Sequence, residues 1–535
     1  MKLSWISLGL LATLSRETRA LQLKRGTPRD ELTYAPNYFQ QKINHFPENG
    51  LPYANSTFSQ RYYFDSSYYK PGGPVYLYIG GETSGPSRFS NLQTGIIQIL
   101  MEATNGLGVI LENRYYGESY PFTTSTTDQL AFLTTNQTIA DNAYFAQNAV
   151  FPGIDKDLTA PGTPWILYGG SLAGAQTAFS VKKYGDVLYG GIASSAPIEI
   201  VVGYPEWYSP IQKYAPQDCV ARINNIVDKF DTLVATNQTA AIHQFKALFG
   251  LEVLTDHRDF AAAIADPIGN PGTYHSNTWQ ELNWNTTYGS RDFFYFCGNV
   301  TDFDAPESIT QVDYALSNYT NGEPWVGLGG YANYIKTYTL PLCEPGDYNS
   351  NGDCFGTQNQ SYWADITNSG ARSYLYTSCT EQGAYIDAPK EGPTLLSRVI
   401  DISYEQQWCT WAFPDGSYNK VPASPDLSTY NSFGGFGLSA DRLAFIDGDQ
   451  DVWNGLCYHS PLAPSPRSQR VDDLRPELLI TGAGHHWDSS GILDVEAEPQ
   501  FIREAHLWEI RAVRTWLRDF GAWEPGRKGR KRTML

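Results

Sequence analysis

The chain has 535 residues, of which 41% are hydrophobic and 18% are charged, and its formal net charge at pH 7 is −18. This acidic balance argues against nucleic acids and anionic membranes as partners, since both are negatively charged. Beyond the N-terminus no stretch approaches the roughly 20 apolar residues of a membrane helix, so we expect a soluble globular protein.

The N-terminus predicts export. Residues 1–20 have Lys2 near their start, an apolar run over 3–14 and small residues around a cleavage site after Ala20, which is typical of a secretory signal peptide. Seven Asn-x-Ser/Thr sequons follow, as expected for a secreted glycoprotein; they lie at Asn55, Asn136, Asn237, Asn285, Asn299, Asn318 and Asn359.

Short apolar runs then alternate with segments of helical spacing, which indicates a mainly parallel β-sheet covered by helices. The predicted strands lie at 61–64, 74–79, 108–111, 165–168, 190–197, 442–446 and 477–480. The predicted helices lie at 91–103, 139–149, 173–184 and 501–520, the last being amphipathic and expected to pack on the sheet.

Residues 201–438 interrupt this alternation. They are rich in Tyr, Asn and Gly and hold six of the seven cysteines, so we interpret them as a disulfide-bonded cap inserted over an active site. The chain would then comprise a signal peptide at 1–20, an α/β domain in two parts at 21–200 and 439–522, the cap at 201–438 and a basic solvated tail at 523–535.

The seven cysteines predict disulfides, because in an oxidising compartment they should pair and leave one odd thiol. Cys343 and Cys354 are separated by Gly- and Asn-rich residues and should close a local loop, while Cys457 could join the cap to the second part of the α/β domain. Buried free cysteines are the alternative. Neither a Cys-x-x-Cys pair nor a His-Glu-x-x-His helix occurs, so neither a metal nor any other cofactor is expected.

A glycine-rich turn around Ser171 is the first sign of catalytic chemistry. It lies between the predicted strand at 165–168 and the helix at 173–184, where Gly169 and Gly170 leave room for a sharp elbow. A serine hydroxyl is a poor nucleophile, so it needs a nearby base and a third group that orients the base. Such a turn could instead bind a phosphate, but no Gly-x-Gly-x-x-Gly motif or Walker lysine is present.

Candidates for the acid and the base follow the last two predicted strands. Three aspartates follow the strand at 442–446, and a histidine doublet, His485 and His486, lies in a Gly-rich turn after 477–480. The order serine, acid, histidine is the one that α/β-hydrolases use, whereas chymotrypsin-type and subtilisin-type enzymes use other orders. The pattern alone leaves open which member of each group takes part; the three aspartates are Asp447, Asp449 and Asp451.

Several longer segments resemble peptidase family S28, the group of Pro-X carboxypeptidases, dipeptidyl-peptidase II and fungal extracellular prolyl peptidases. Residues 40–46 and 57–62 are similar to its N-terminal signature, 112–119 to its most recognisable block, and 193–197 to the segment after its nucleophile. The resemblance covers both parts of the α/β domain and is weakest over the cap. It implies an α/β-hydrolase fold.

The resemblance also assigns roles. Ser171 matches the nucleophile, Asp451 of Asp-Val-Trp matches the acid of the family's Asp-Pro-Trp, and His485 matches the first histidine of its Gly-Ala-His-His. Ala173 stands where many members have glycine. After the histidines, residues 487–490 read Trp-Asp-Ser-Ser where lysosomal members have Leu-Asp-Leu-Arg, so an arginine near the site is missing.

An oxyanion hole and a pocket complete the predicted site. The backbone N–H of Leu172 is the natural first oxyanion donor, and the loop after an early strand should supply the second at Gly81. Trp453 and Trp487 each lie within two residues of a predicted triad member, so we interpret them either as walls of a proline-sized pocket or as core residues.

The resemblance implies a secreted serine peptidase that cleaves proline-containing peptides after proline through an acyl-serine. It leaves carboxypeptidase and endopeptidase action open. The missing arginine favours an endopeptidase, because a cation usually binds a free carboxylate, whereas the family's exopeptidase habit favours a carboxypeptidase. A lipase-like esterase and a non-catalytic binding protein on the same fold are remoter alternatives, and the oligomeric state is not predicted.

Overall fold

The computed structural model describes residues 33–269, 279–285, 287, 289–343, 350–464 and 472–523. The predicted signal peptide at 1–20 lies outside the described residues, and so does the predicted basic tail beyond Trp523. Both remain predictions.

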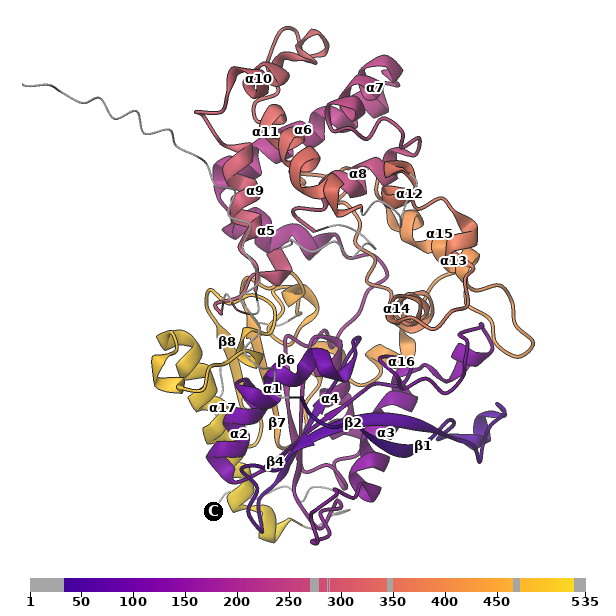
Figure 1. Cartoon of the computed structure of the whole chain (residues 1–535), viewed down its shortest axis with the longest axis vertical. Helices are drawn as coiled ribbons and strands as arrows, with labels where there is room; N and C mark the ends of the chain where they lie inside the picture. The colour runs from indigo at the N-terminus through magenta and orange to yellow at the C-terminus, as the bar shows by residue number, and fades with distance from the viewer. Residues whose placement is uncertain are drawn as a thin grey trace, which may run out of the picture. The chain divides into compact units, whose positions relative to one another are not determined.

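An eight-stranded sheet forms the centre of the α/β part, in the order β1-β2-β4-β3-β5-β6-β7-β8 (Figure 1). The pairs β1–β2 and β2–β4 are antiparallel and all others are parallel. This arrangement confirms the expected α/β class and is the α/β-hydrolase fold. The strands are β1 Asn37–Lys42, β2 Thr57–Asp65, β3 Val75–Ile79, β4 Leu107–Leu111, β5 Trp165–Gly170, β6 Gly190–Ser194, β7 Leu443–Gly448 and β8 Glu477–Ile480.

Both faces of the sheet are covered by helices and buried. Side chains alternate between the two faces along each strand, so each strand contributes to both cores. In β3, Tyr76 and Tyr78 pack with α2 (Ile96–Thr104) and α17 (Gln500–Arg518). Val75 and its alternate neighbours in β3 face the opposite core, which includes residues of α3 (Thr135–Asn148) and the start of α4 (Leu172–Lys183). This two-sided burial explains why the strands are continuous apolar runs.

The structure differs from the prediction at two elements. The strand β1 was not predicted, because its side chains are mostly polar and partly exposed at the edge of the sheet. The single helix expected at 91–103 is two helices, α1 (Phe89–Gln93) and α2, which break at Gly95. A Cβ atom on Gly95 would lie 2.6 Å from the Ser489 carbonyl oxygen, so the break lets the backbone approach the turn that carries the histidine doublet.

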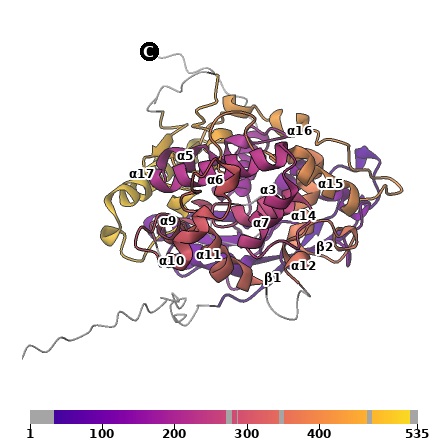
Figure 2. The same cartoon turned by 90° about the horizontal axis from the view of Figure 1, so that it is seen from above.

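The chain between β6 and β7, here called the helical insertion, contains no strand among its described residues. Most of its helices lie above the sheet in Figure 1. In Figure 2, which is seen from above, these helices lie in front of the sheet. No helix in the described part of the chain is long and apolar enough to span a bilayer. The α-helices of the insertion are α5 Ser209–Tyr214, α6 Gln217–Ala235, α7 Thr239–Leu248, α8 His257–Ala265, α9 Asp292–Val300, α10 Glu307–Thr310, α11 Leu328–Tyr334, α12 Asn351–Phe355, α13 Gln360–Trp363, α14 Gly370–Thr377, α15 Ile402–Ala412 and α16 Ser428–Asn431.

Three disulfides lie within the helical insertion and confirm the expected pairing of six cysteines. They are Cys219–Cys297, Cys343–Cys354 and Cys379–Cys409, so the predicted local loop closure is present. The suggested link through Cys457 was wrong, because the other six cysteines pair with one another. The Cys457 thiol is free and buried, and it donates a hydrogen bond to the Trp453 carbonyl oxygen at 3.1 Å.

Candidate active site

Ser171 occupies a sharp elbow between β5 and α4. Its φ of +61° lies in the left-handed region, which is rare for a residue with a side chain, and its N–H donates to the Ser194 carbonyl oxygen of β6 at 2.9 Å. The elbow requires its glycines: a Cβ on Gly169 would lie 2.1 Å from the Ala173 carbonyl oxygen, and one on Gly170 would lie 3.0 Å from the ring of His486. The serine is thereby held at the carboxyl end of the sheet, next to the histidine turn.

Asp451 and His485 form a buried pair at the same end of the sheet. Asp451 follows β7, His485 follows β8, and the His485 Nδ1 lies 2.9 and 3.0 Å from the two carboxylate oxygens of Asp451. The side chain of His485 is 4% exposed and that of Asp451 is 0% exposed. The Nε2 of His485 is buried and has no hydrogen-bond partner among the described residues. An imidazole oriented in this way has its second nitrogen free to accept a proton.

The other aspartates after β7 are engaged elsewhere. The Asp447 carboxylate accepts from the backbone N–H of His459 at 3.0 Å and lies 2.7 Å from its Nδ1. Asp449 accepts from the Gly482 N–H at 2.7 Å. Of the three aspartates that the sequence left open, the structure therefore joins Asp451 to His485.

The second histidine of the doublet has a different environment. The His486 N–H donates to Ser195 Oγ at 2.9 Å, and its Nδ1 lies 2.9 Å from Ser489 Oγ. Burial lowers the pKa of His486 well below its ordinary value, and the neighbouring His485 contributes in the same direction. His486 is therefore a neutral residue that shapes the turn.

The two expected oxyanion donors lie around the start of α4. Leu172 is the first residue of that helix, where backbone N–H groups are free of intrahelical partners. Gly81 follows β3 with φ of +69°, and a Cβ placed on it would lie 3.7 Å from the Ala173 side chain. The Gly81 backbone thus approaches the elbow closely, as a second donor would require.

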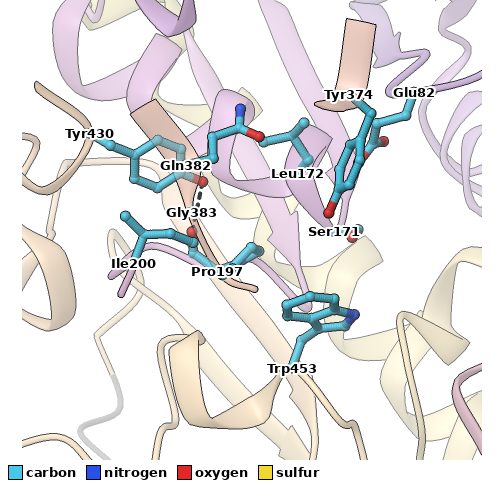
Figure 3. Close-up of a pocket in the computed structure, with 11 residues that line it drawn as sticks. Glu82, Ser171, Leu172, Pro197, Ile200, Tyr374, Gln382, Gly383, Tyr430 and Trp453 are labelled. Carbon is cyan, nitrogen blue, oxygen red and sulfur yellow. Dashed lines mark hydrogen bonds between the residues drawn. The ribbon is translucent and has the colours of Figure 1, made fainter. Parts of the chain in front are cut away.

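A pocket opens beside Ser171 (Figure 3). Trp453 forms one wall, and its ring stacks on Tyr204 with centroids 5.7 Å apart. Trp487, the other expected wall, does not line this pocket; its indole N–H donates to the Leu282 carbonyl oxygen at 2.6 Å, and a substrate contact of Trp487 remains a prediction. The lining residues are Glu82, Ser171, Leu172, Pro197, Ile200, Tyr374, Gln382, Gly383, Ala384, Tyr430 and Trp453.

The pocket also contains groups that sequence reasoning missed. Tyr374, Tyr430 and residues 382–384 come from the helical insertion, where no motif marked them. Glu82 directly follows the expected oxyanion residue, and no lysine or arginine is among the described residues that line the pocket. Burial raises the pKa of Glu82, although Arg88 and His485 oppose this effect. Its position after Gly81 was the one signal in the sequence that could have revealed it.

The predicted glycosylation sites differ in exposure. Asn55, Asn237, Asn318 and Asn359 are exposed, whereas Asn136 and Asn299 are half-buried. Asn285 is buried and its side-chain amide donates to the Gly491 carbonyl oxygen at 3.3 Å. A glycan on Asn285 would need this contact to break, so occupancy is expected first at the four exposed positions.

The fold and the pairing of Asp451 with His485 beside a serine elbow define the class of the protein as a serine hydrolase of the α/β-hydrolase fold. The model of the Serine carboxypeptidase S28 family matches residues 41–499. The chain belongs to this family, as the resemblance of the motifs indicated, and it is a serine peptidase.

Relatives support the same family. The chain is 36% identical over 501 residues to the "Probable extracellular serine carboxypeptidase" of Arthroderma benhamiae, covering 90% of this chain and 67% of that protein. It is 27% identical to Serine protease vicPa of Bipolaris victoriae, covering 94% and 92% of the two chains. It is 24% identical to the Lysosomal Pro-X carboxypeptidase of Pongo abelii, covering 91% and 89%.

Proposed function

We propose that this enzyme is a secreted carboxypeptidase that cleaves peptides after proline through an acyl-serine intermediate. The observation that carries the proposal is the buried His485, whose Nδ1 is held by Asp451 while its Nε2 has no hydrogen-bond partner among the described residues. Its neighbour His486 lies against Gly170, so the histidine turn is next to the Ser171 elbow. Every group that an acyl-transfer triad needs is present in the expected order.

The reaction would proceed in two steps. The Nε2 of His485 takes the proton of Ser171 Oγ as this oxygen attacks the carbonyl carbon, and Asp451 stabilises the resulting imidazolium. The N–H groups of Leu172 and Gly81 donate to the oxyanion, and His485 then gives its proton to the leaving amine, so that the peptide bond breaks and an ester to Ser171 remains. A water molecule, deprotonated by His485, hydrolyses that ester and restores the serine.

The pocket supports selectivity for proline. Pro197, Ile200 and the Trp453 ring line it, and a rigid pyrrolidine ring would fill such a slot better than a flexible or charged side chain. The relative from Pongo abelii points in the same direction, since its name specifies a Pro-X carboxypeptidase.

A prolyl endopeptidase is the second candidate function. Glu82 favours it, because an ionised carboxylate beside Ser171, with no lysine or arginine lining the pocket, would repel the free carboxylate of a C-terminal residue. The raised pKa of Glu82 offers a way for a carboxypeptidase to work nevertheless: at acidic pH the protonated carboxyl would donate a hydrogen bond to the substrate's carboxylate. The family's name and the name of the relative from Arthroderma benhamiae favour the carboxypeptidase.

Mass spectrometry of products distinguishes the two. A peptide with proline at its penultimate position is offered with a free and with an amidated carboxyl terminus, alongside a longer peptide with an internal proline. A carboxypeptidase releases the last residue from the free acid only, whereas an endopeptidase cleaves the internal bond and ignores amidation. The Ser171→Ala variant is the control. Equal cleavage after proline and after alanine would overturn the proposed specificity.

Secretion forms part of the proposal. It is supported by the predicted signal peptide at 1–20, by three disulfides, which persist in oxidising compartments, and by the extracellular relative. Expression in the source cells with N-terminal sequencing of the protein in the medium tests it, and a protein that stays inside the cells with residues 1–20 attached would contradict it.

A further inference from the structure

The histidine turn is connected to the sheet by the buried carboxylate of Asp488, which is 2% exposed. One oxygen of this carboxylate accepts from the Tyr168 hydroxyl and the other from the Ser194 hydroxyl, both at 2.5 Å. Hydrogen bonds of this length from hydroxyl groups to a carboxylate are among the strong ones in proteins. Asp488 thus receives a separate donor on each of its oxygens.

Both donors belong to the strands that build the nucleophile elbow. Tyr168 lies on β5, three residues before Ser171, and Ser194 is the last residue of β6. The Ser194 carbonyl oxygen also accepts from the Ser171 N–H. A single carboxylate therefore joins the turn that carries the base to the two strands that position the nucleophile.

The other side of the turn is held by α17. The His506 Nε2 lies 2.8 Å from the Asp488 carbonyl oxygen, and its Nδ1 lies 2.7 Å from the Glu498 carboxylate. The His506 side chain is fully buried. These contacts fix the backbone of the turn, while the Asp488 side chain sets its position relative to β5 and β6.

We propose that Asp488 is a positioning residue for catalysis: it holds His485 in register with Ser171 by bonding the histidine turn to Tyr168 and Ser194. This inference rests on the proposed triad. Asp488 does not line the pocket, so it acts through the position of the base and leaves substrate binding to other residues. A misplacement of about 1 Å in a catalytic group can slow a reaction about 100-fold.

The rate at which a fluorophosphonate labels Ser171 is a suitable readout. This reagent phosphonylates the serine oxygen and releases fluoride, and it reports activation of the nucleophile without depending on peptide specificity. Asp488→Ala removes both hydrogen bonds, and Asp488→Asn keeps a single carbonyl acceptor in the same volume. The Tyr168→Phe, Ser194→Ala double variant removes both donors instead and keeps the test available if Asp488→Ala does not fold.

Glu509→Gln is the matched control. Glu509 is also a fully buried carboxyl near Asp488, but neither of its oxygens has a hydrogen-bond partner among the described residues. Burial raises its pKa well above the ordinary value, so the carboxyl is neutral and glutamine resembles it in charge and shape. Labelling of this variant should stay within twofold of the unmodified enzyme.

We expect labelling to slow about 100-fold in Asp488→Ala and in the double variant, and about 10-fold in Asp488→Asn, with KM for a peptide substrate unchanged within twofold. Labelling within threefold of the unmodified rate in folded Asp488→Ala or in the double variant would overturn the proposal, even if the melting temperature falls. An equal slowing in Glu509→Gln would also overturn it. Labelling of Ser171→Ala would instead refute the nucleophile itself, which distinguishes the two failures.

Discussion

Replacing Glu381 by glutamine should remove a large pH dependence of stability. Glu381 lies in the π-helical turn Ser378–Gln382 of the helical insertion and is buried. One of its carboxyl oxygens accepts from the N–H and the hydroxyl of Thr135, at 2.5 and 2.7 Å. Thr135 is the first residue of α3, so the carboxyl of Glu381 satisfies the N-terminus of a helix in the α/β part. Burial raises the pKa of Glu381 from 4.5 to about 7.

The direction of the effect follows from this pKa. In the folded chain the carboxyl keeps its proton up to about pH 7, whereas in the unfolded chain it loses the proton near pH 4.5. The proton therefore contributes stability that is fully present below pH 4.5 and is lost as the pH rises through 7. Because each tenfold difference in proton affinity is worth about 1.4 kcal/mol, the loss between these limits is about 3 kcal/mol. Glutamine keeps an acceptor for Thr135 but cannot ionise, so Glu381→Gln should not suffer this loss.

Calorimetry at pH 5 and pH 8 measures the difference. About 2.5 kcal/mol of this loss falls between pH 5 and pH 8. At about 2.1 cal/mol/K per residue, a chain of 535 residues has an unfolding entropy of about 1 kcal/mol/K, so Glu381→Gln should gain about 2 °C on the unmodified protein between the two pH values. Glu391→Gln, which changes an exposed carboxyl of the same insertion, should show no such gain. If the unmodified protein and Glu381→Gln lose the same stability between pH 5 and pH 8, the carboxyl is already ionised at pH 5 and the argument is refuted.

Other predictions concern activity. Ser171→Ala and His485→Ala should each lower kcat by a factor on the order of 10³ or more, because the triad acts as one unit, while His486→Ala should lower kcat far less. Steady-state kinetics on a peptide substrate measures these changes. If His486→Ala were inactive and His485→Ala nearly as active as the unmodified enzyme, the base would be His486. Trp453→Ala should lower kcat/KM for proline substrates more than for alanine substrates, by roughly 1 to 3 kcal/mol, whereas equal losses would indicate packing damage. Cleavage of a free-acid substrate should decline as the pH rises and Glu82 loses its proton, and Glu82→Gln should lack that decline in a pH profile of kcat/KM; an unchanged profile would remove Glu82 from carboxylate recognition.

Most of the central sheet could be predicted from the sequence because its strands are buried on both faces. The predicted strand at 477–480 coincides with β8, and the runs at 108–111 and 165–168 fall within β4 and β5. The edge strand β1 gave no such signal, since most of its side chains are polar. The close approach of Gly95 to the Ser489 carbonyl oxygen could not be foreseen, because the two residues are about 400 positions apart in the chain.

The site shows the same division. Ser171, Asp451 and His485 lie in short local motifs whose residue types and order point to acyl transfer, so they could be named in advance. Tyr374 could not, because only its position in the pocket marks it, and that position depends on how the helical insertion packs on the α/β part. Glu82 had one signal in the sequence, its place directly after Gly81. Distance in sequence carries no information about such contacts.

The central claim is that Ser171 carries a peptidyl acyl group whose last residue is proline. An activated ester of a short peptide with C-terminal proline makes hydrolysis of the acyl-enzyme the slow step, so the intermediate accumulates and can be trapped with acid. Mass spectrometry of the digested enzyme should then find the acyl group on Ser171, and much less of it when the ester ends in alanine. An acyl group on another residue, no acyl-enzyme at all, or equal acylation by the proline and alanine esters would contradict the account.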